Sequence, residues 1–207
     1  MGAKLFILYN SSMPDLAKLE SFVRLLHEVE KIKRTARRPD EREQTSTAEH
    51  TFELAMFCWY IASVNKLDLN HEKILKYALA HDIIEAYAGD TYTFDEEAKK
   101  TKEAREKAAI DRMEEEFPEF SELTQTLHEY ESRSTPEAVF VYAADKLIDP
   151  VNLSMELTQS AWKENNVSWN MLIDNKEKKI ALSAPILAYW RELVKKLEAK
   201  KDFFFHS

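Results

Sequence analysis

Glycine, cysteine and long hydrophobic runs are scarce in this chain of 207 residues, which has two glycines and one cysteine. A β-rich fold of this size needs many turn glycines, so their scarcity favours a mostly helical protein. The single cysteine, Cys58, excludes a disulfide within the chain, as is typical of a reducing compartment. No run approaches the roughly 18 apolar residues of a membrane span, and the short apolar run near the start does not match a secretory signal. We therefore predict a cytoplasmic protein without a membrane partner.

Positive charge is also in short supply, because 29 Lys and Arg residues face 37 Asp and Glu residues and the net charge is −8. Binding to a nucleic-acid backbone needs clustered Lys and Arg, so we predict no nucleic-acid partner. The chain has neither a Gly-rich phosphate loop nor a Gly-x-Ser-x-Gly elbow, which removes two common kinds of active site. Its hydrophobic fraction of 44% suits a globular protein. The length suits one domain over residues 1–207.

Apolar spacings of three and four residues predict a series of helices with one buried face each. The expected ranges are 14–34, 46–65, 71–88, 95–117, 121–132, 136 to beyond 152, 169–182 and 184–200. Ser46 and Glu49 have the spacing of a capping box, and Gly89 is placed to end the third helix in a left-handed conformation. Pro150 is expected to kink or break the helix that contains it. Residues 35–45 are predicted to form a charged loop, and the fold class is all-α.

Two histidines and two aspartates suggest a metal site, namely His50, His81, Asp82 and Asp145. Their wide spacing is typical of ligands that converge from separate helices of a bundle rather than of a zinc finger. His81 and Asp82 interrupt an apolar stretch and Asp145 follows another, where an ionised carboxylate is costly unless it is paired or metal-bound. Singly, each residue has a plainer interpretation, as a core histidine, a cap or an arginine partner. Together they favour one divalent ion with positions left for water and substrate.

Three segments carry a family resemblance: Ala48-Glu-His50, Ala80-His-Asp-Ile-Ile-Glu-Ala-Tyr-Ala-Gly-Asp90 and Ala144-Asp-Lys-Leu147. They resemble the HD-domain metal-dependent phosphohydrolases, and among them the bacterial 5′-deoxynucleotidase branch. The resemblance covers about residues 20–155 and implies an HD-type helical bundle, with the helices of 168–200 packing on it. It implies metal ligation by the four residues named above and hydrolysis of a phosphate ester on a nucleotide. Members are often homodimers, so a homodimer is expected.

The same resemblance implies that Glu85 and Asp90 act in catalysis. Glu85 lies three residues after Asp82 and so on nearly the same helical face, and Asp90 follows the helix-ending glycine. A divalent cation lowers the pKa of a bound water from about 15.7 to roughly 7–9, and a nearby carboxylate can orient that water or take its proton. The plainer interpretations are a solvated helix charge for Glu85 and a turn or cap residue for Asp90.

The number of metal ions follows from the remaining histidines. Dinuclear relatives carry additional histidine ligands between the His-Asp pair and the last aspartate, where this chain has only His128 in a charged segment. We predict that His128 lies on the surface and that the protein holds one metal ion. Cobalt, manganese, zinc, iron and magnesium all suit this ligand set, so the identity of the metal is left open.

Residues 31–42 contain six basic and two acidic side chains in a chain that is acidic overall. The segment is either a solvated loop or an attractor for phosphate. In the resembling family an arginine just before the first metal histidine contacts phosphate, and Arg34 matches it, with Arg37 as a second candidate. The branch has a tryptophan beside that arginine, which this chain lacks, so the preference for a deoxy sugar is left open. Lys99 and Lys100 either reach further phosphates or form ion pairs on an exposed helix.

These features lead to one predicted function and two alternatives. The predicted function is a 5′-(deoxy)nucleotidase that releases inorganic phosphate from nucleoside monophosphates, with a small-molecule nucleotide as its partner. The first alternative is a dNTP triphosphohydrolase, which releases triphosphate instead. The second is a non-catalytic, metal-stabilised module that binds a nucleotide. The aromatic run at residues 203–205 is either a dimer contact or a frayed end.

Overall fold

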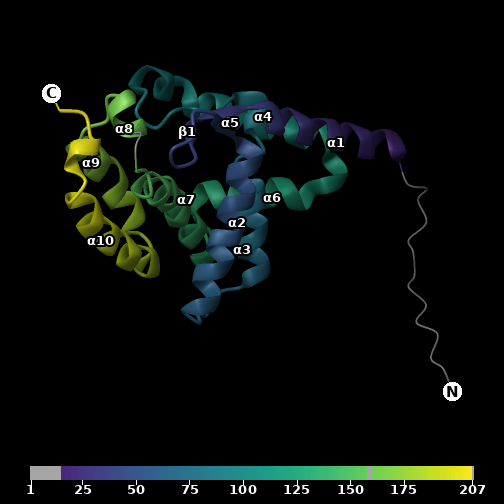
Figure 1. Ribbon diagram of the computed structural model, residues 1–207. Coiled ribbons are helices and arrows are strands. Elements are labelled where there is room, and N and C mark those ends of the chain that lie inside the picture. The colour runs from purple at the N-terminus through teal and green to yellow at the C-terminus, as the bar shows by residue number, and fades with distance from the viewer. Residues whose placement is uncertain (1–14, 158–159, 207) are drawn as a thin grey trace.

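Helices carry nearly all of the regular structure in the computed structural model, which describes residues 15–157 and 160–206 (Figure 1). The longer helices are α1 (Leu16–Lys31), α2 (Thr47–Val64), α3 (His71–Ala80), α5 (Glu96–Glu116), α6 (Ser121–Ser132), α7 (Pro136–Ser154), α9 (Trp169–Ile180) and α10 (Ala184–Glu198). The short elements are α4 (Glu85–Ala88), α8 (Ala161–Glu164), the 3₁₀ turns η1 (Pro118–Phe120) and η2 (Lys201–Phe203), and the strands β1 (Lys33–Arg37) and β2 (Gln44–Ser46). The predicted all-α class is confirmed.

Helix α7 is the central element of the fold. It contacts α2, α3 and α6 on one side and α9 and α10 on the other, and Figure 1 shows α9 and α10 together at the C-terminal side of the molecule. One buried apolar cluster joins α2, α3, α7, α9 and α10, and a second lies between α1, α5 and α6. Among the described residues, no helix combines the length and the apolar character needed to cross a bilayer.

The start of α2 follows the predicted capping box. The Glu49 backbone N–H donates to Ser46 Oγ at 3.2 Å, and the Ser46 backbone N–H donates to Glu49 Oε2 at 2.7 Å. These reciprocal bonds satisfy donors that the first turn of a helix leaves free. His50 is the residue directly after Glu49. By fixing the start of α2, the capping box therefore also fixes the position of this first candidate metal ligand in the core.

The charged segment before α2 is a hairpin rather than the predicted loop. Helix α1 ends at Lys31, because Ile32 is extended, and β1 then pairs antiparallel with β2. Arg34 therefore lies on a strand and not at the end of the first helix. The prediction was wrong because the two strands have only five and three residues, which is too short a pattern to be recognised from the sequence alone.

The predicted helix over 71–88 is interrupted where the candidate ligands lie. Residues 81–84 form tight turns in which the N–H of Ile83 donates to Ala80 O and that of Glu85 donates to Asp82 O, both at 3.0 Å. Side chains three residues apart eclipse in such 3₁₀ geometry, so Asp82 and Glu85 face the same side. Gly89 ends α4 with φ 72° and ψ 154°. Its positive φ was predicted, but its ψ is extended, in a region that is open essentially to glycine alone.

One further prediction about a helix needs correction. Pro150 does not break α7, which continues to Ser154. The missing N–H removes one bond to the Lys146 carbonyl, and burial of neighbouring side chains such as Leu147 and Leu153 holds the helix together. The predicted start of the first helix at Pro14 lies outside the described residues and stays a prediction.

The apolar face of α1 is only partly buried. Leu25 and Val29 are buried, whereas Leu16 and Leu19 are 64% and 59% exposed. Figure 1 shows the reason, because the N-terminal part of α1 extends away from the rest of the chain. Periodicity correctly marks the helix, but it does not say whether a partner surface exists within the chain.

Candidate active site

The four predicted metal ligands come together in the interior, between α2, the turn after α3, and α7. His81 Nε2 lies 3.0 Å from Asp82 Oδ2, and His50 Nε2 lies 3.8 Å from the same oxygen. One ligand atom from each of these three residues lies within 4.8 Å of the others. Asp145 joins the cluster through His50, with Nε2 and Oδ1 3.1 Å apart. Residues from three separate parts of the sequence thus present nitrogen and oxygen atoms to one small region.

The state of His81 fits a metal ligand. Its Nδ1 lies 2.9 Å from the Ala78 carbonyl, which only accepts, so Nδ1 carries the proton and donates. In the neutral imidazole, which is the form that binds a metal ion, this leaves the lone pair on Nε2. His81 Nε2 is buried and lacks a hydrogen-bond partner, because its short contact with Asp82 does not have hydrogen-bond geometry. A divalent cation would satisfy this atom, and the donor set of imidazole nitrogen and carboxylate oxygen suits such an ion.

The charges of the cluster stabilise one another. Burial alone would raise the pKa of Asp82, but His81 and Arg34 hold it well below its usual value. Asp145 behaves in the same way, with Lys146 and the imidazole of His50 lowering its pKa against the effect of burial. Both carboxylates are therefore ionised at neutral pH, which is the form that binds a metal ion.

Arg34 connects the cluster to a second carboxylate. Its Nη1 donates to Asp82 Oδ2 at 3.1 Å and its Nη2 donates to Asp149 Oδ2 at 3.3 Å. Its Nε is buried and has no hydrogen-bond partner. Asp149 was not predicted. The signal was available, because Asp149 lies four residues after Asp145 and thus one turn further along the same buried helix.

Glu85 and Asp90 lie in the electrostatic field of the cluster. Thr47, at the start of α2, donates from Oγ1 to Glu85 Oε2 at 2.7 Å. Burial, together with the charges of Asp82 and Asp90, raises the pKa of Glu85 to about 9. Burial also raises the pKa of Asp90, with Arg34 opposing the shift. The structure therefore places two carboxyl groups with raised pKa values beside two ionised ones, a separation of pKa values that is common in active sites.

The other candidates lie away from the cluster. Arg37 makes ion pairs with Glu164 and Glu156, at 2.5 and 3.7 Å, and does not contact the predicted ligands. His128 is on the surface, as predicted, where its Nε2 lies 3.1 Å from Glu114 Oε1. Lys99 and Lys100 make ion pairs within α5 with Glu96 and Glu97, three residues earlier, which agrees with the plainer of the two interpretations.

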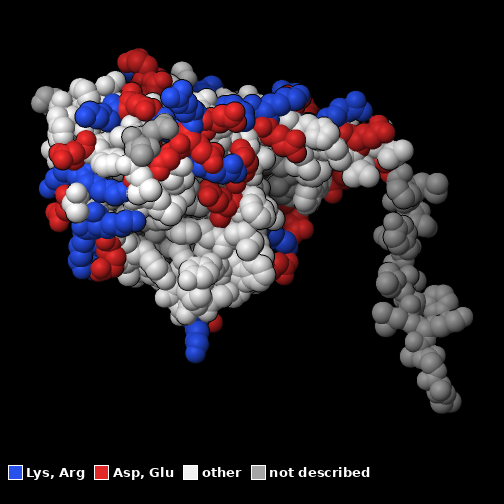
Figure 2. Space-filling model, viewed as in Figure 1, with Lys and Arg blue, Asp and Glu red and all other residues white. Residues whose placement is uncertain are grey.

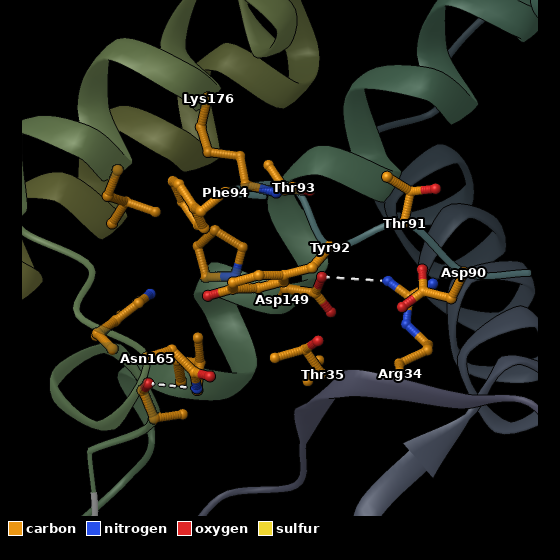
Figure 3. Close-up of a pocket in the computed structure, with 16 residues that line it drawn as sticks. Arg34, Thr35, Asp90, Thr91, Tyr92, Thr93, Phe94, Asp149, Asn165 and Lys176 are labelled. Atoms are coloured by element: carbon orange, nitrogen blue, oxygen red, sulfur yellow. Dashed lines mark hydrogen bonds and ion pairs between the residues drawn. The ribbon is translucent and has the colours of Figure 1, made fainter. Parts of the chain in front are cut away.

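A pocket opens beside Arg34 and extends from the cluster toward α8 and α9 (Figure 3). It encloses about 590 Å³ of empty space, part of which is open to solvent. The end of the pocket near the candidate metal ligands is lined by Arg34, Asp90 and Asp149. Other parts are lined by Tyr92, Phe94, Trp162, Asn165 and Lys176. Trp162 stacks on Phe204 with ring centroids 4.4 Å apart. Phe204 is therefore buried behind Trp162 of the pocket wall, and neither alternative proposed for the C-terminal aromatic run describes it.

These features define a helical, metal-binding fold with an adjoining pocket, and comparison with known proteins identifies it. The HD domain family model matches residues 26–187. This range is more than half of the chain, so the chain belongs to the HD domain family.

Among individual proteins, the chain is similar to 5′-deoxynucleotidase HDDC2 of Mus musculus and of Homo sapiens. The identities are 32% over 136 residues and 31% over 137 residues, which cover 63% and 62% of this chain and 65% and 63% of those proteins. The chain thus matches slightly less than two thirds of the length of these relatives. A predicted metal-dependent phosphohydrolase from Magnetospirillum magnetotacticum has a similar structure, with a TM-score of 0.79, 28% identity, and coverage of 92% of this chain and 96% of that one.

Proposed function

We propose that the protein is a metal-dependent phosphohydrolase of nucleotides, and in particular a 5′-deoxynucleotidase that releases inorganic phosphate from nucleoside monophosphates. The observation that carries the proposal is the buried cluster of His50, His81, Asp82 and Asp145, in which His81 Nε2 lacks a partner and Arg34 leads directly into a pocket. The names of the relatives support the same activity.

In this proposal the four clustered residues hold one divalent ion of Co, Mn, Zn, Fe or Mg. When bound, such an ion supplies positive charge for the phosphoryl oxygens and acidifies water. Arg34 binds the substrate phosphate, since its guanidinium faces both the cluster and the pocket and its buried Nε is a donor without an acceptor. Arg37, the second candidate for phosphate, stays a prediction from sequence.

Glu85 and Asp90 are assigned to proton transfer and orientation. The hydroxyl of Thr47 donates to one oxygen of Glu85, which positions the carboxyl group to orient the attacking water. The pKa of Glu85 is about 9 in the protein alone, and the positive charge of a bound divalent ion would lower it and give the carboxylate that takes the proton. Asp90 lies next to Glu85, at the end of the pocket near the ligand cluster. There it holds the water or the leaving oxygen in line with the phosphate that Arg34 binds.

The direct test is product analysis with purified protein. The protein, loaded with manganese or cobalt, is incubated with a panel of nucleoside monophosphates and triphosphates. Inorganic phosphate from the monophosphates supports the proposal, whereas triphosphate released from dNTPs supports the first alternative. If no nucleotide is hydrolysed by protein with its metal content verified, the module interpretation gains support. The variant Glu85→Ala separates these hypotheses further. If the protein is an enzyme, the variant should keep its fold and its metal content but lose most of its turnover, whereas a non-catalytic module has no turnover in either form.

We also propose that the protein is a homodimer. The outer face of α2 offers a contact surface, because Phe52, Met56 and Tyr60 recur every four residues and are 68%, 46% and 64% exposed. Figure 2 shows that the surface around the lower part of α2 has few charged side chains. Molecular mass in solution tests this proposal: the double variant Phe52→Glu with Tyr60→Glu is expected to be monomeric, with unchanged metal content.

A cytoplasmic location is proposed as well, on the support of the lone cysteine. Cys58 is fully buried, and burial raises the pKa of its thiol, so it is a packing residue and not a reactive one. Fractionation of cells that express the protein tests this location.

A further inference from the structure

Lys176 is a buried cation without a partner at the far end of the pocket. It lies on α9, is only 4% exposed, and points into the pocket opposite Arg34 and Asp90 (Figure 3). Its interactions with described residues are long-range charge effects, with Asp149 as the largest favourable one, and none is a hydrogen bond. Burial lowers its pKa to about 8. A buried ammonium group without an acceptor is costly, so this position lowers the stability of the empty protein.

The walls between the two ends of the pocket are aromatic and apolar. Tyr92 and Phe94 pack edge to face with ring centroids 5.5 Å apart, and Trp162 is held by its stacking on Phe204. Leu172 and Pro150 also line this part. Flat and mostly apolar walls with one charged group at the end, and with Asn165 and Thr93 as neutral polar neighbours, are suited to a planar heterocycle that carries a matching polar atom.

The polar atom that matches Lys176 must accept hydrogen bonds. A second phosphate group is disfavoured, because phosphate oxygens require several donors and Lys176 is the one lysine that lines the pocket among the described residues. The carboxylate of Asp149, whose charge has the largest favourable effect on Lys176, would also repel a phosphate bound to this lysine. A carbonyl oxygen on a nucleobase needs only one or two donors and carries no net charge, so it fits both the single cation and the apolar walls.

We infer that Lys176 is a specificity residue whose ammonium group donates to a carbonyl oxygen of the nucleobase. This inference rests on the proposed function for the placement of the substrate phosphate at Arg34. The site would then bind nucleotides whose base has a carbonyl oxygen more tightly than nucleotides with the same ring but without that oxygen. Hypoxanthine, guanine, uracil and thymine all have such an oxygen. An analogue without the oxygen would leave a buried donor unsatisfied, which is the arrangement that discriminates most strongly.

A matched pair of ligands isolates this oxygen. 2′-Deoxyinosine and purine 2′-deoxyriboside share the sugar and the purine ring, and hypoxanthine adds the oxygen at C6 with its N1 proton. Binding of these two nucleosides to the metal-loaded protein is measured by NMR titration, which requires no hydrolysis. Since a hydrogen bond to a charged group contributes about 1.5–3 kcal/mol, the wild type is expected to bind deoxyinosine about 10- to 100-fold more tightly.

Substitutions then assign the preference to Lys176. Lys176→Met is expected to bind both nucleosides equally, and Lys176→Gln, which keeps a neutral donor, to retain part of the preference. Lys179→Met is the control, because Lys179 lies one turn further along α9, donates to Asn175 Oδ1 at 3.0 Å, and does not line the pocket. It should discriminate as the wild type does. Circular dichroism verifies that each variant is folded.

The kinetic arm separates this inference from the proposed function. The same comparison is made with the two 5′-monophosphates, as kcat/KM for phosphate release. A preference in nucleoside binding without any hydrolysis would refute the proposed activity and leave the inference standing. Equal affinity of the wild type for the two nucleosides, no binding of either, or a preference that survives in Lys176→Met would overturn the inference. So would a loss of triphosphate binding in Lys176→Met with base preference unchanged, since that would place a phosphate at Lys176.

Discussion

The cluster of candidate metal ligands and the far end of the pocket both contain buried charged side chains, but the two regions differ in how these charges are paired. In the cluster, each charged group faces one of opposite sign, as Asp82 does with Arg34 and Asp145 with Lys146. At the other end, Lys176 has no hydrogen-bond acceptor among the described residues. In the cluster the chain itself supplies the opposite charges that position the two carboxylates, whereas at the pocket end Lys176 gains an acceptor only from a ligand. Each of the following predictions tests one side of this contrast.

The largest effect is expected from removing a carboxylate of the cluster. Asp82→Asn loses the negative charge that His50, His81 and Arg34 share, so the protein should bind metal poorly. Loss of a residue that merely supports a ligand already costs about 10- to 100-fold in affinity or activity, and we expect a loss at the upper end of that range or beyond. Elemental analysis and phosphate release measure it, with His128→Gln as the surface control. Full metal content in Asp82→Asn would contradict the assignment.

A change at Glu85 should separate catalysis from metal binding. Glu85→Gln keeps the size of the side chain and a partner for the Thr47 hydroxyl, so fold and metal content should be retained. Activity should fall by about 10²- to 10⁴-fold, the usual contribution of a general base. Glu114→Gln, at an exposed carboxylate that contacts only His128, is the matched control. If the Glu85→Gln variant kept its activity, Glu85 would not be the general base.

On the pocket side, removal of the unpartnered cation should stabilise the fold. Lys176→Met replaces a buried ammonium group by an apolar chain of similar length. The pKa of Lys176 falls from 10.5 to about 8, and such a difference corresponds to about 3 kcal/mol. We therefore expect a higher free energy of unfolding at pH 7, measured by denaturant titration, together with weaker base discrimination. A less stable variant would mean that Lys176 has a favourable structural partner.

The same pKa predicts how this gain depends on pH. Below pH 8 the ammonium group is charged in both the folded and the unfolded protein, so the full cost of burying it applies. Between pH 8 and 10.5 the folded protein binds fewer protons than the unfolded chain, so the stability of the wild type rises with pH. The advantage of Lys176→Met should therefore shrink across this window. An advantage that stays constant from pH 7 to 10 would show that the charge is not its cause.

The smallest effect is expected one turn further along the same helix. Burial also lowers the pKa of Lys179 to about 8, but this side chain is only half-buried and donates to Asn175. Lys179→Met should change the free energy of unfolding by less than about 0.5 kcal/mol, as is usual for substitutions outside the core. A gain as large as that of Lys176→Met would indicate a general effect of lysine on α9 and would weaken the contrast between paired and unpaired charge.

Several elements were predictable because their signals are local. The capping box at Ser46 and Glu49 and the positive φ of Gly89 follow from residue types at fixed spacings. The hairpin, the interruption of the helix at His81 and the continuation of α7 through Pro150 were not predictable in this way. The hairpin joins neighbouring segments, but its strands are too short to be recognised. The other two features depend on packing against distant segments, which can outweigh local propensity.

In the candidate site, too, some residues were predictable from local sequence signals and others were not. The four ligands stood out from sequence because a histidine or an aspartate inside an apolar helix is costly and calls for a chemical reason. Asp149 was detectable in principle from its spacing to Asp145. Lys176 was not, because it lies in a segment rich in lysine whose pattern is that of a surface helix.

By itself, the sequence determined the helical class, the candidate metal ligands and the membership of a family with an HD motif, since these depend on residue chemistry and short-range spacing. Only the tertiary structure decided that Arg34 lies between the cluster and the pocket, that α1 leaves part of its apolar face uncovered, and that Lys176 is buried. The reason is physical: the burial and the partners of a side chain are properties of everything packed around it. For Lys176 those surroundings come from α7, α8 and the segment before α5, which are remote in sequence and meet only in the folded chain.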